Sequence, residues 1–457
     1  MSPTLHWPGK RKTYAPPSAL YLRHNFGERK RWRNMLIQGD NLAVMGALSP
    51  NLFYRKKIEW AGGIKLVYID PPFDVGQDFH MESDAGASGV IRHLAYSDKW
   101  GKADKSFLSM LYSRLWAIKD LLAEDGVIYL HCDWRVEAYV RLMLEEVFGK
   151  HNFMNTLIWQ RDSAAKGSKK HAKQWSRDAD SIIVFRKSAK TPFYPVYKKQ
   201  LSDTQLREYM YRDAGGRKFK KVTLGGYNQA AVQRFRQQGL IYKTSSGREY
   251  KKYFLDEAKF AIGSIWTDIV NLSKGQKEQQ GYPTQKPEAL LERIISAATK
   301  PGDIVADFFC GSGTLAVVAE KMGRKWIASD MGGLAVHTAR KRLLATQASF
   351  SMYGLSGYAP KEGLRVVTSF GREYSVRVTD MPGKHWQDTL DFLQVVGNRT
   401  WRDFKTKQKR DLQLQTPNMF TGAASVLAVD MFGNEYTAIA RPRKFRRLLC
   451  YRPGTSE

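Results

Sequence analysis

Short apolar runs alternate with amphipathic stretches along much of the chain. The runs 66–69, 127–130 and 303–309 hold mainly β-branched, aromatic and leucine residues, which is typical of strands buried on both faces. The stretches 106–122 and 288–299 repeat apolar residues at helical spacing. Strands that alternate with helices predict an α/β fold built on a parallel sheet.

The first of these strands runs directly into Asp70-Pro71-Pro72-Phe73. Two prolines cannot continue a strand ladder, so they hold this segment stiffly at the carboxyl end of the strand. Ligands of open α/β sheets bind at that edge. A carboxylate, two rigid carbonyls and an aromatic ring can hold a flat heterocycle that carries an amino group. A simple strand-ending turn is the alternative interpretation.

A second segment has the pattern of a nucleotide-binding half-fold. The strand 303–309 is followed by Gly311-Ser312-Gly313, a helix, and a strand that ends at Asp330. The pyrophosphate fingerprint is absent, because residues 311–316 read GSGTLA. This favours a nucleoside without a diphosphate. S-adenosylmethionine fits, with Asp330 placed to accept hydrogen bonds from its ribose hydroxyls.

Three other stretches do not point to a single chemical role. Asp40 or Asn41 either caps the helix that follows or faces a ligand. His131 and Asp133, at the end of their strand, either border a base pocket or are satisfied polar strand ends. Residues 74–97 are polar and glycine-rich, which predicts a mobile loop.

The charge of the chain indicates a polyanionic partner. The 457 residues include 73 Lys and Arg against 44 Asp and Glu, a formal net charge of +29. Nucleic acid is the expected partner. Residues 152–262 combine bases with interleaved aromatics, which suits phosphate contacts and stacking on bases. The candidate DNA-binding residues are Lys166, Lys169, Lys170, Arg217, Lys218 and Lys220.

The remaining composition favours a cytoplasmic protein. The three cysteines, Cys132, Cys310 and Cys450, lack metal or disulfide spacing, which indicates a reducing compartment. No apolar run approaches membrane length, and the start of the sequence lacks a signal-peptide core. No metal, no membrane and no covalent nucleophile are expected.

Several motifs together resemble those of the DNA amino-methyltransferases. They are DPPF, GDN, YPTQKP and DFFCGSGT followed by WIASD. The target-base motif precedes the cofactor motif with a recognition region between them, which is the β-class order. The resemblance covers about residues 35–345. Modification subunits of type III restriction systems and many solitary methyltransferases look like this.

The resemblance implies a Rossmann-like, S-adenosylmethionine-dependent methyltransferase sheet with an inserted target-recognition region. The residues after it predict a β-rich C-terminal extension, because 365–369 and 426–439 look like strands. The expected parts are a basic N-terminal arm (1–34), a catalytic half (35–151), the target-recognition insert (152–262), a cofactor-binding half (263–348) and an extension of unknown role (349–457).

The resemblance also implies residue roles. Asp70 and the carbonyls of Pro71 or Pro72 would bind the target amino group, and Phe73 would stack on the flipped base. Phe73 stands where the family most often has tyrosine, and Asp330 where it most often has glutamate. The implied cofactor residues are Asp40 at the adenine amino group, with Asn41; Thr284, Lys286 and Pro287 by the methionine carboxylate; Asp307, Phe309, Gly311, Ser312, Gly313 and Thr314 in the loop; and Asp330 at the ribose.

The function implied is methylation of adenine N6 in double-stranded DNA, with base flipping. Methylation of cytosine N4 uses the same contacts and is the nearest alternative; an aspartate at position 70 favours adenine. A DNA-binding modification subunit that works with a partner nuclease or translocase is an alternative of another class. At family level the expected partners are DNA, a second copy of the chain, and a restriction endonuclease or translocase.

Overall fold

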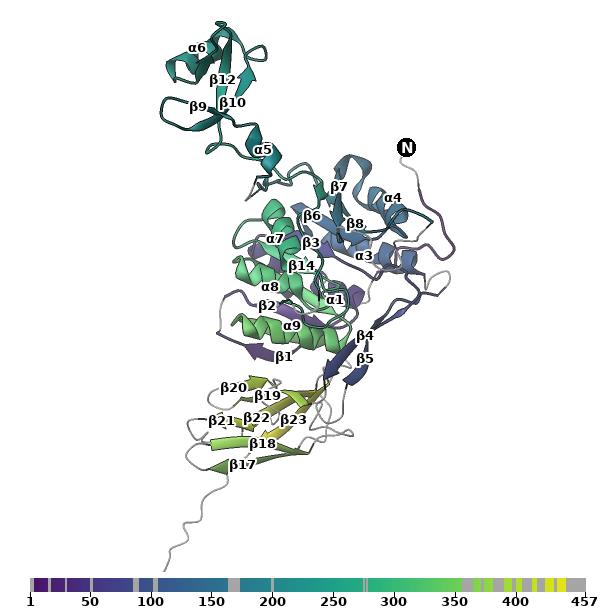
Figure 1. The fold of residues 1–457 in the computed structure, drawn as a ribbon. Helices are drawn as coiled ribbons and strands as arrows, with labels where there is room; N and C mark the ends of the chain where they lie inside the picture. Colours follow the sequence, from purple (N-terminus) through teal and green to yellow (C-terminus); the bar gives the residue numbers. More distant parts are fainter. Residues whose placement is uncertain are drawn as a thin grey trace, which may run out of the picture. The chain divides into compact units, whose positions relative to one another are not determined.

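The chain divides into two compact units. We call Met1–Pro192 together with Thr267–Glu457 the sheet unit, and Phe193–Trp266 the inserted unit (Figure 1). The computed structural model describes residues 4–14, 18–28, 31–49, 52–84, 90–101, 106–162, 173–198, 201–273, 276, 278–355, 365–370, 374–380, 390–396, 400–404, 413–416, 424–430 and 434–440.

A mixed sheet forms the centre of the sheet unit, and its middle strands are parallel, which confirms the α/β prediction. The pairs β1–β16, β6–β8 and β7–β8 are antiparallel. In spatial order the strands are β1 (Leu20–Phe26), β16 (Phe350–Leu355), β2 (Asn34–Gln38), β15 (Lys325–Asp330), β14 (Ile304–Asp307), β3 (Ile64–Ile69), β6 (Leu122–Cys132), β8 (Ala179–Arg186) and β7 (Phe153–Gln160).

The strand order reverses between β14 and β3. From β14 the chain passes through α8 (Thr314–Lys321) to β15 on one side, and from β3 through α3 (Phe107–Leu121) to β6 on the other. Right-handed crossovers in opposite directions place these two helices on opposite faces of the sheet. The carboxyl ends of β14 and β3 therefore border the crevice where such sheets bind ligands.

The helices of the sheet unit form two groups. On one face α3 packs against α1 and α4, and on the other α8 packs against α7 and α9 (Figure 1). The remaining bounds are α1 (Asn41–Leu48), α2 (Leu52–Trp60), α4 (Glu137–Phe148), the short 3₁₀ helix η3 (Lys150–Asn152), α7 (Glu288–Ala298) and α9 (Gly333–Ala345).

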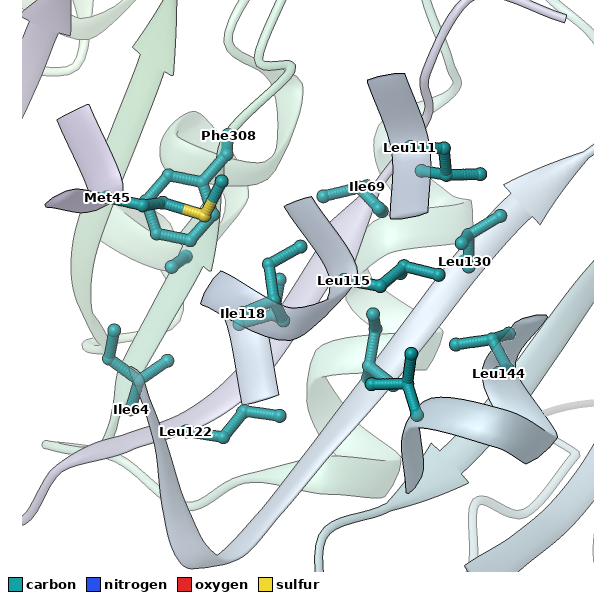
Figure 2. Packing of buried hydrophobic residues seen from close by; sticks show 14 of the residues in the cluster. Met45, Ile64, Ile69, Leu111, Leu115, Ile118, Leu122, Leu130, Leu144 and Phe308 are labelled. Atoms are coloured by element: carbon teal, nitrogen blue, oxygen red, sulfur yellow. The ribbon is translucent and has the colours of Figure 1, made fainter. Parts of the chain in front are cut away.

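The α3 face of the sheet holds a large hydrophobic core. Leu111 and Leu115 of α3 point towards Ile69 of β3 and Leu130 of β6, and Phe308, just after β14, enters the same cluster (Figure 2). All five side chains are fully buried. Because each such side chain contributes about 1.5–3 kcal/mol by leaving water, this core fixes the ends of β3 and β14 beside each other.

The prediction of a mobile loop over 74–97 is wrong for residues 78–84 and 90–97, which form two strands; residues 85–89 lie outside the described residues. β4 (Asp78–Asp84) and β5 (Val90–Ser97) pair antiparallel, and the rings of Phe79 and Tyr96 stack with centroids 4.7 Å apart. The polar residues that suggested a loop occupy a two-stranded ribbon, whose polar side chains can face water.

The sequence predicts a basic arm over residues 1–34, but part of this arm forms β1, an edge strand paired with β16. The insert was expected to begin at residue 152, but β7 and β8 pair within the main sheet. β7 alternates buried and exposed positions, so its polar residues hid it in the sequence. β1 and β7 lie towards the two ends of the sheet, and each is buried only in part.

The inserted unit is a small β-rich body. Its four-stranded sheet has the order β11-β12-β10-β9 and is antiparallel. Its elements are α5 (Asp203–Arg207), β9 (Tyr211–Arg212), β10 (Lys218–Thr223), α6 (Gln229–Gln237), β11 (Ile241–Lys243), β12 (Glu249–Phe254) and β13 (Ile265–Trp266).

The C-terminal extension is rich in strands, as predicted. One sheet has the order β17-β18-β21 and the other β20-β19-β22-β23. The strands are β17 (Arg365–Phe370), β18 (Tyr374–Asp380), β19 (Leu390–Val396), β20 (Thr400–Phe404), β21 (Gln413–Thr416), β22 (Ala424–Asp430) and β23 (Glu435–Ala440).

No helix among the described residues is long and apolar enough to cross a membrane.

Candidate active site

A cavity of about 510 Å³ opens at the carboxyl ends of β3, β14 and β15. It brings together most residues that the sequence singles out. The predicted site residues that line it are Asp40, Asn41, Asp70, Pro71, Pro72, Phe73, Thr284, Lys286, Asp307, Phe309, Gly311, Ser312, Thr314 and Asp330.

Two predicted cofactor residues do not line the cavity. Pro287 precedes α7 in an extended conformation. Gly313 precedes α8 with φ = 74°, and a Cβ there would lie 2.6 Å from Cβ of Ala339. Gly313 therefore permits close packing of α8 on α9, rather than the approach of a ligand to the backbone.

Asp70 has one partner and one unsatisfied oxygen. Lys286 Nζ donates to its Oδ2, a contact that the sequence did not predict, and the role of Lys286 by a methionine carboxylate stays a prediction. The other oxygen, Oδ1, is buried, and no donor among the described residues reaches it. Buried polar atoms are rarely left without a partner, so this oxygen is a candidate for binding a ligand N–H.

The ring of Phe73 lies between the cavity and a buried histidine. It stacks on His131 with ring centroids 6.0 Å apart. His131 hydrogen-bonds the Tyr68 hydroxyl (Nδ1, 3.0 Å) and Asp180 (Nε2, 3.1 Å), and it does not line the cavity. Asp133 is likewise paired, with Arg135. Of the two interpretations of these strand-end residues, the structure shows satisfied polar groups.

Backbone donors hold the carboxylate of Asp330. Its Oδ2 accepts the N–H of Gly311 at 2.9 Å and its Oδ1 the N–H of Gly332 at 2.8 Å. A Cβ at Gly311 would lie 3.2 Å from the ring of Tyr282, and φ there is 47°. The loop after β14 is therefore fixed by these contacts, with lone pairs of Asp330 still free of backbone donors.

Asp40 caps α1 through Ala43 N–H (3.1 Å) and also lines the cavity, so capping does not rule out the ligand contact, which stays a prediction. Arg114 joins it to Asn41: the guanidinium donates to Asp40 Oδ2 at 2.7 Å and to the Asn41 amide oxygen. The Asn41 amide donates to Phe308 O at 2.8 Å. Arg114 was missed because helical spacing alone gave no reason to select it.

The cavity is strongly acidic. Five aspartates but only two basic residues, Arg114 and Lys286, line it. Burial raises the pKa of Asp307 well above its usual range; the charges of Asp70 and Asp330 add to the rise, and the Phe309 N–H opposes it. Burial also raises the pKa of Asp330, against its backbone donors. A cationic ligand would relieve this uncompensated negative charge.

The structure describes three of the six predicted DNA-binding residues. Arg217 pairs with Asp256 and Glu257, and Lys220 pairs with Glu208. Lys218 is exposed. The remaining three candidates, Lys166, Lys169 and Lys170, lie outside the described residues.

Residues 64–341, more than half of the chain, match the N6_N4_Mtase family model, described as DNA methylase. The chain belongs to this DNA methylase family. It is 47% identical over 313 residues to the type II methyltransferase M2.LlaDCHI of Lactococcus lactis subsp. cremoris, covering 68% of this chain and 88% of that protein.

Two other relatives are matched over a smaller share of their own length. The chain is 27% identical over 314 residues to the type II methyltransferase M.EcaI of Enterobacter cloacae (63% of this chain, 66% of that one). Identity to the HindVI Mod subunit, a probable type III restriction-modification enzyme of Haemophilus influenzae, is 25% over 413 residues (70% and 52%). The chain thus spans only about half to two thirds of the length of these two relatives.

Among solved structures, the M1.HpyAVI–SAM complex aligns with a TM-score of 0.38 and 18% identity, covering 68% of this chain and 98% of that one.

The DNA methylase motifs have the β-class order. The DPPF segment follows β3, the glycine loop follows β14, and the inserted unit lies between them in the sequence. In space β3 and β14 are adjacent parallel strands. Sequence order and spatial adjacency together put the two motifs on one cavity.

Proposed function

We propose that this chain transfers a methyl group from S-adenosylmethionine to N6 of adenine in double-stranded DNA. One observation carries the proposal: the end of β3, with Asp70 to Phe73, and the ends of β14 and β15, with Asp307 and Asp330, line the same cavity. A base and a nucleoside cofactor held there would have their reacting atoms side by side.

The cofactor side fits S-adenosylmethionine. Asp330 retains lone pairs for the ribose hydroxyls after its two backbone bonds, and Asp40 can accept from the adenine amino group. The acidic cavity suits a ligand with a sulfonium and an ammonium group. When bound, S-adenosylmethionine supplies the electrophilic methyl.

The target side fits an exocyclic amino group. Asp70 Oδ1 is buried and unsatisfied, and it can accept one N–H while a carbonyl of Pro71 or Pro72 accepts the other. Phe73 offers a face for stacking. Holding both N–H groups frees the nitrogen lone pair for attack, and Asp70 can then accept the proton that the methylated nitrogen must lose. A base inside a duplex cannot reach this site, so it must be flipped out, at a cost of a few kcal/mol.

The inserted unit is our candidate for target recognition. Lys221 lies 4.1 Å from the ring of Tyr211, and Lys251 lies 4.0 Å from the ring of Phe235. Lysines over aromatic rings suit phosphates and unstacked bases. Because Arg217 and Lys220 are engaged by acids, Lys221 and Lys251 are the better candidates for DNA contacts within this unit.

Relatives that are named Mod subunits of type III restriction-modification enzymes support a further proposal about partners. We infer that the chain acts as a modification subunit, either alone, as a homodimer, or beside a restriction endonuclease or translocase. Co-purification with the products of neighbouring genes would identify such a partner.

Methyl transfer from tritiated S-adenosylmethionine to duplex DNA tests the reaction. The wild type should label DNA, whereas Asp70→Ala should lower kcat by at least about 10³-fold while cofactor affinity by calorimetry stays unchanged. Asp125→Ala, which removes a partly exposed carboxylate that pairs with Lys65 of β3, is the matched control and should retain activity.

Loss of both methyl transfer and cofactor binding in Asp70→Ala would mean that Asp70 is structural. Wild-type protein that binds the cofactor and labels no DNA would overturn the substrate assignment. Label in N4-methylcytosine would replace adenine with cytosine while leaving the chemistry of the site unchanged.

A further inference from the structure

Asp98 is a buried acid with no role in the proposed chemistry. It follows β5 directly and is 1% exposed. The β4–β5 ribbon returns the chain to the segment that follows Phe73: Asp98 N–H donates to Gln77 O at 2.9 Å, and Gly76 N–H donates to Asp98 O at 3.0 Å. Residue 98 is therefore held beside the Pro-Pro-Phe turn although 24 residues separate it from Asp74.

Four N–H groups converge on the Asp98 carboxylate. Oδ2 accepts the backbone N–H of Phe73 at 3.0 Å and of Val75 at 2.9 Å. Oδ1 accepts the N–H of Asp74 at 3.0 Å and the indole N–H of Trp100 at 2.7 Å. A buried carboxylate is tolerated only when donors replace its water, and here both oxygens are supplied.

The backbone of the turn is shaped to present these donors. Asp74 has φ = 58°, in the left-handed region that non-glycine residues rarely adopt. In this turn the consecutive N–H groups of residues 73–75 point to one side, as in an anion-binding concavity of the backbone. In this chain the anion is a side chain of the protein itself. The strained turn and the carboxylate hold each other in place.

We propose that Asp98 is a positioning residue for methyl transfer: it fixes the turn 73–75 so that the ring of Phe73 and the carbonyls before it face the target base. The inference rests on the proposed function. It does not make Asp98 a catalytic residue, because its oxygens face the turn's own N–H groups.

A nearby aspartate provides a matched control. Asp78 begins β4 of the ribbon and also accepts hydrogen bonds, from Ser97 Oγ at 2.7 Å and Lys99 Nζ at 2.5 Å, but these partners are exposed side chains. Asp98→Asn keeps the shape of the side chain but turns an N–H₂ group towards N–H donors. Asp78→Asn makes the same chemical change outside the turn.

The first measurement is amide hydrogen exchange of peptides that contain residues 73–75, followed by mass spectrometry without DNA. In Asp98→Asn these amides should exchange faster, and in Asp78→Asn they should not change. Unchanged exchange in Asp98→Asn would overturn the proposal whether or not the chain methylates DNA, so this arm does not depend on the proposed function.

The second measurement is the kinetics of methyl transfer to a duplex that the wild type methylates. Asp98→Asn should lower kcat by about 100-fold, because a shift of about 1 Å in a positioned group costs that much, with unchanged affinity for S-adenosylmethionine. Asp98→Glu, which restores the charge, should recover part of kcat. An unchanged kcat, or equal losses of cofactor binding and kcat with no recovery in Asp98→Glu, would show that Asp98 does not position the turn for catalysis.

Discussion

The sheet unit buries charge in two regions, and they differ in how that charge is compensated. At the cavity, Asp70, Asp307 and Asp330 face backbone N–H groups, one lysine and each other. Glu435 instead pairs with two arginines: Arg340 of α9 donates to it at 2.7 Å and Arg23 of β1 at 2.6 Å.

The pKa values follow this difference. Burial would raise the pKa of Glu435, but His24, Arg340 and Arg23 outweigh it and hold that pKa well below the usual range. At the cavity the pKa of Asp307 is raised well above its usual range, mainly by burial. Paired buried charge attaches the C-terminal strands to the sheet, whereas incompletely paired buried charge indicates a ligand that brings its own positive charge.

Breaking the paired region should have the larger effect on stability. Arg340→Met leaves Glu435 buried with fewer cations and removes the donor to His337 Nδ1, so the free energy of unfolding should fall by about 3 kcal/mol, at unchanged affinity for S-adenosylmethionine. Urea unfolding monitored by circular dichroism measures this. Arg55→Met breaks an exposed pair with Glu59 and should cost less than about 0.5 kcal/mol. Equal costs in the two variants would contradict the comparison.

Removing charge from the cavity should have the opposite sign. Asp307→Asn can keep the hydrogen bond from Phe309 N–H and lacks the acid whose charge burial disfavours. The free energy of unfolding without ligand should rise by about 1 kcal/mol, while affinity for S-adenosylmethionine falls about tenfold by calorimetry. A variant that is both less stable and unchanged in affinity would show that Asp307 is a structural acid like Glu435.

The paired region should also weaken in acid. Burial and the neighbouring Arg340 lower the pKa of His337 from 6.5 to about 4, and the geometry agrees: Arg340 donates to Nδ1, so the neutral ring donates from Nε2 to Asp391 at 2.9 Å. Between pH 6.5 and 4 the unfolded chain takes up the proton first, so stability falls as pH falls.

His337→Gln tests this dependence because glutamine cannot gain the proton. The variant should remove a slope of at most about 1.4 kcal/mol per pH unit from the stability profile over that range. Urea unfolding midpoints of wild type and variant at several pH values give the slopes. Parallel profiles would mean that His337 does not titrate on unfolding.

The sequence was most informative where buried parallel strands end. Apolar runs predicted β3, β6 and β14, and the residues at two of their ends, Asp70 and Asp307, do meet at one cavity. Two parallel strands that are neighbours in the sheet put their carboxyl ends at one edge, which explains why the two motifs meet. Each local pattern marked one half of the site, and the resemblance joined the halves.

Contacts between distant polar residues could not be predicted in the same way. The Lys286–Asp70 pair joins residues 216 positions apart, and Arg340–Glu435 joins residues 95 apart. Asp98 had no signal because the segment before it was taken for a loop, and only the β4–β5 pairing brings it back to the Pro-Pro-Phe turn. Side-chain pairing of this kind depends on the completed fold.

The most direct test of the account is single-molecule sequencing of host DNA after expression of the wild type, Asp70→Ala and Asp125→Ala. The account predicts N6-methyladenine within one short motif for the wild type and for Asp125→Ala, and none for Asp70→Ala. N6-methyladenine that persists in Asp70→Ala would contradict the central claim that the unsatisfied oxygen of Asp70 holds the target amino group.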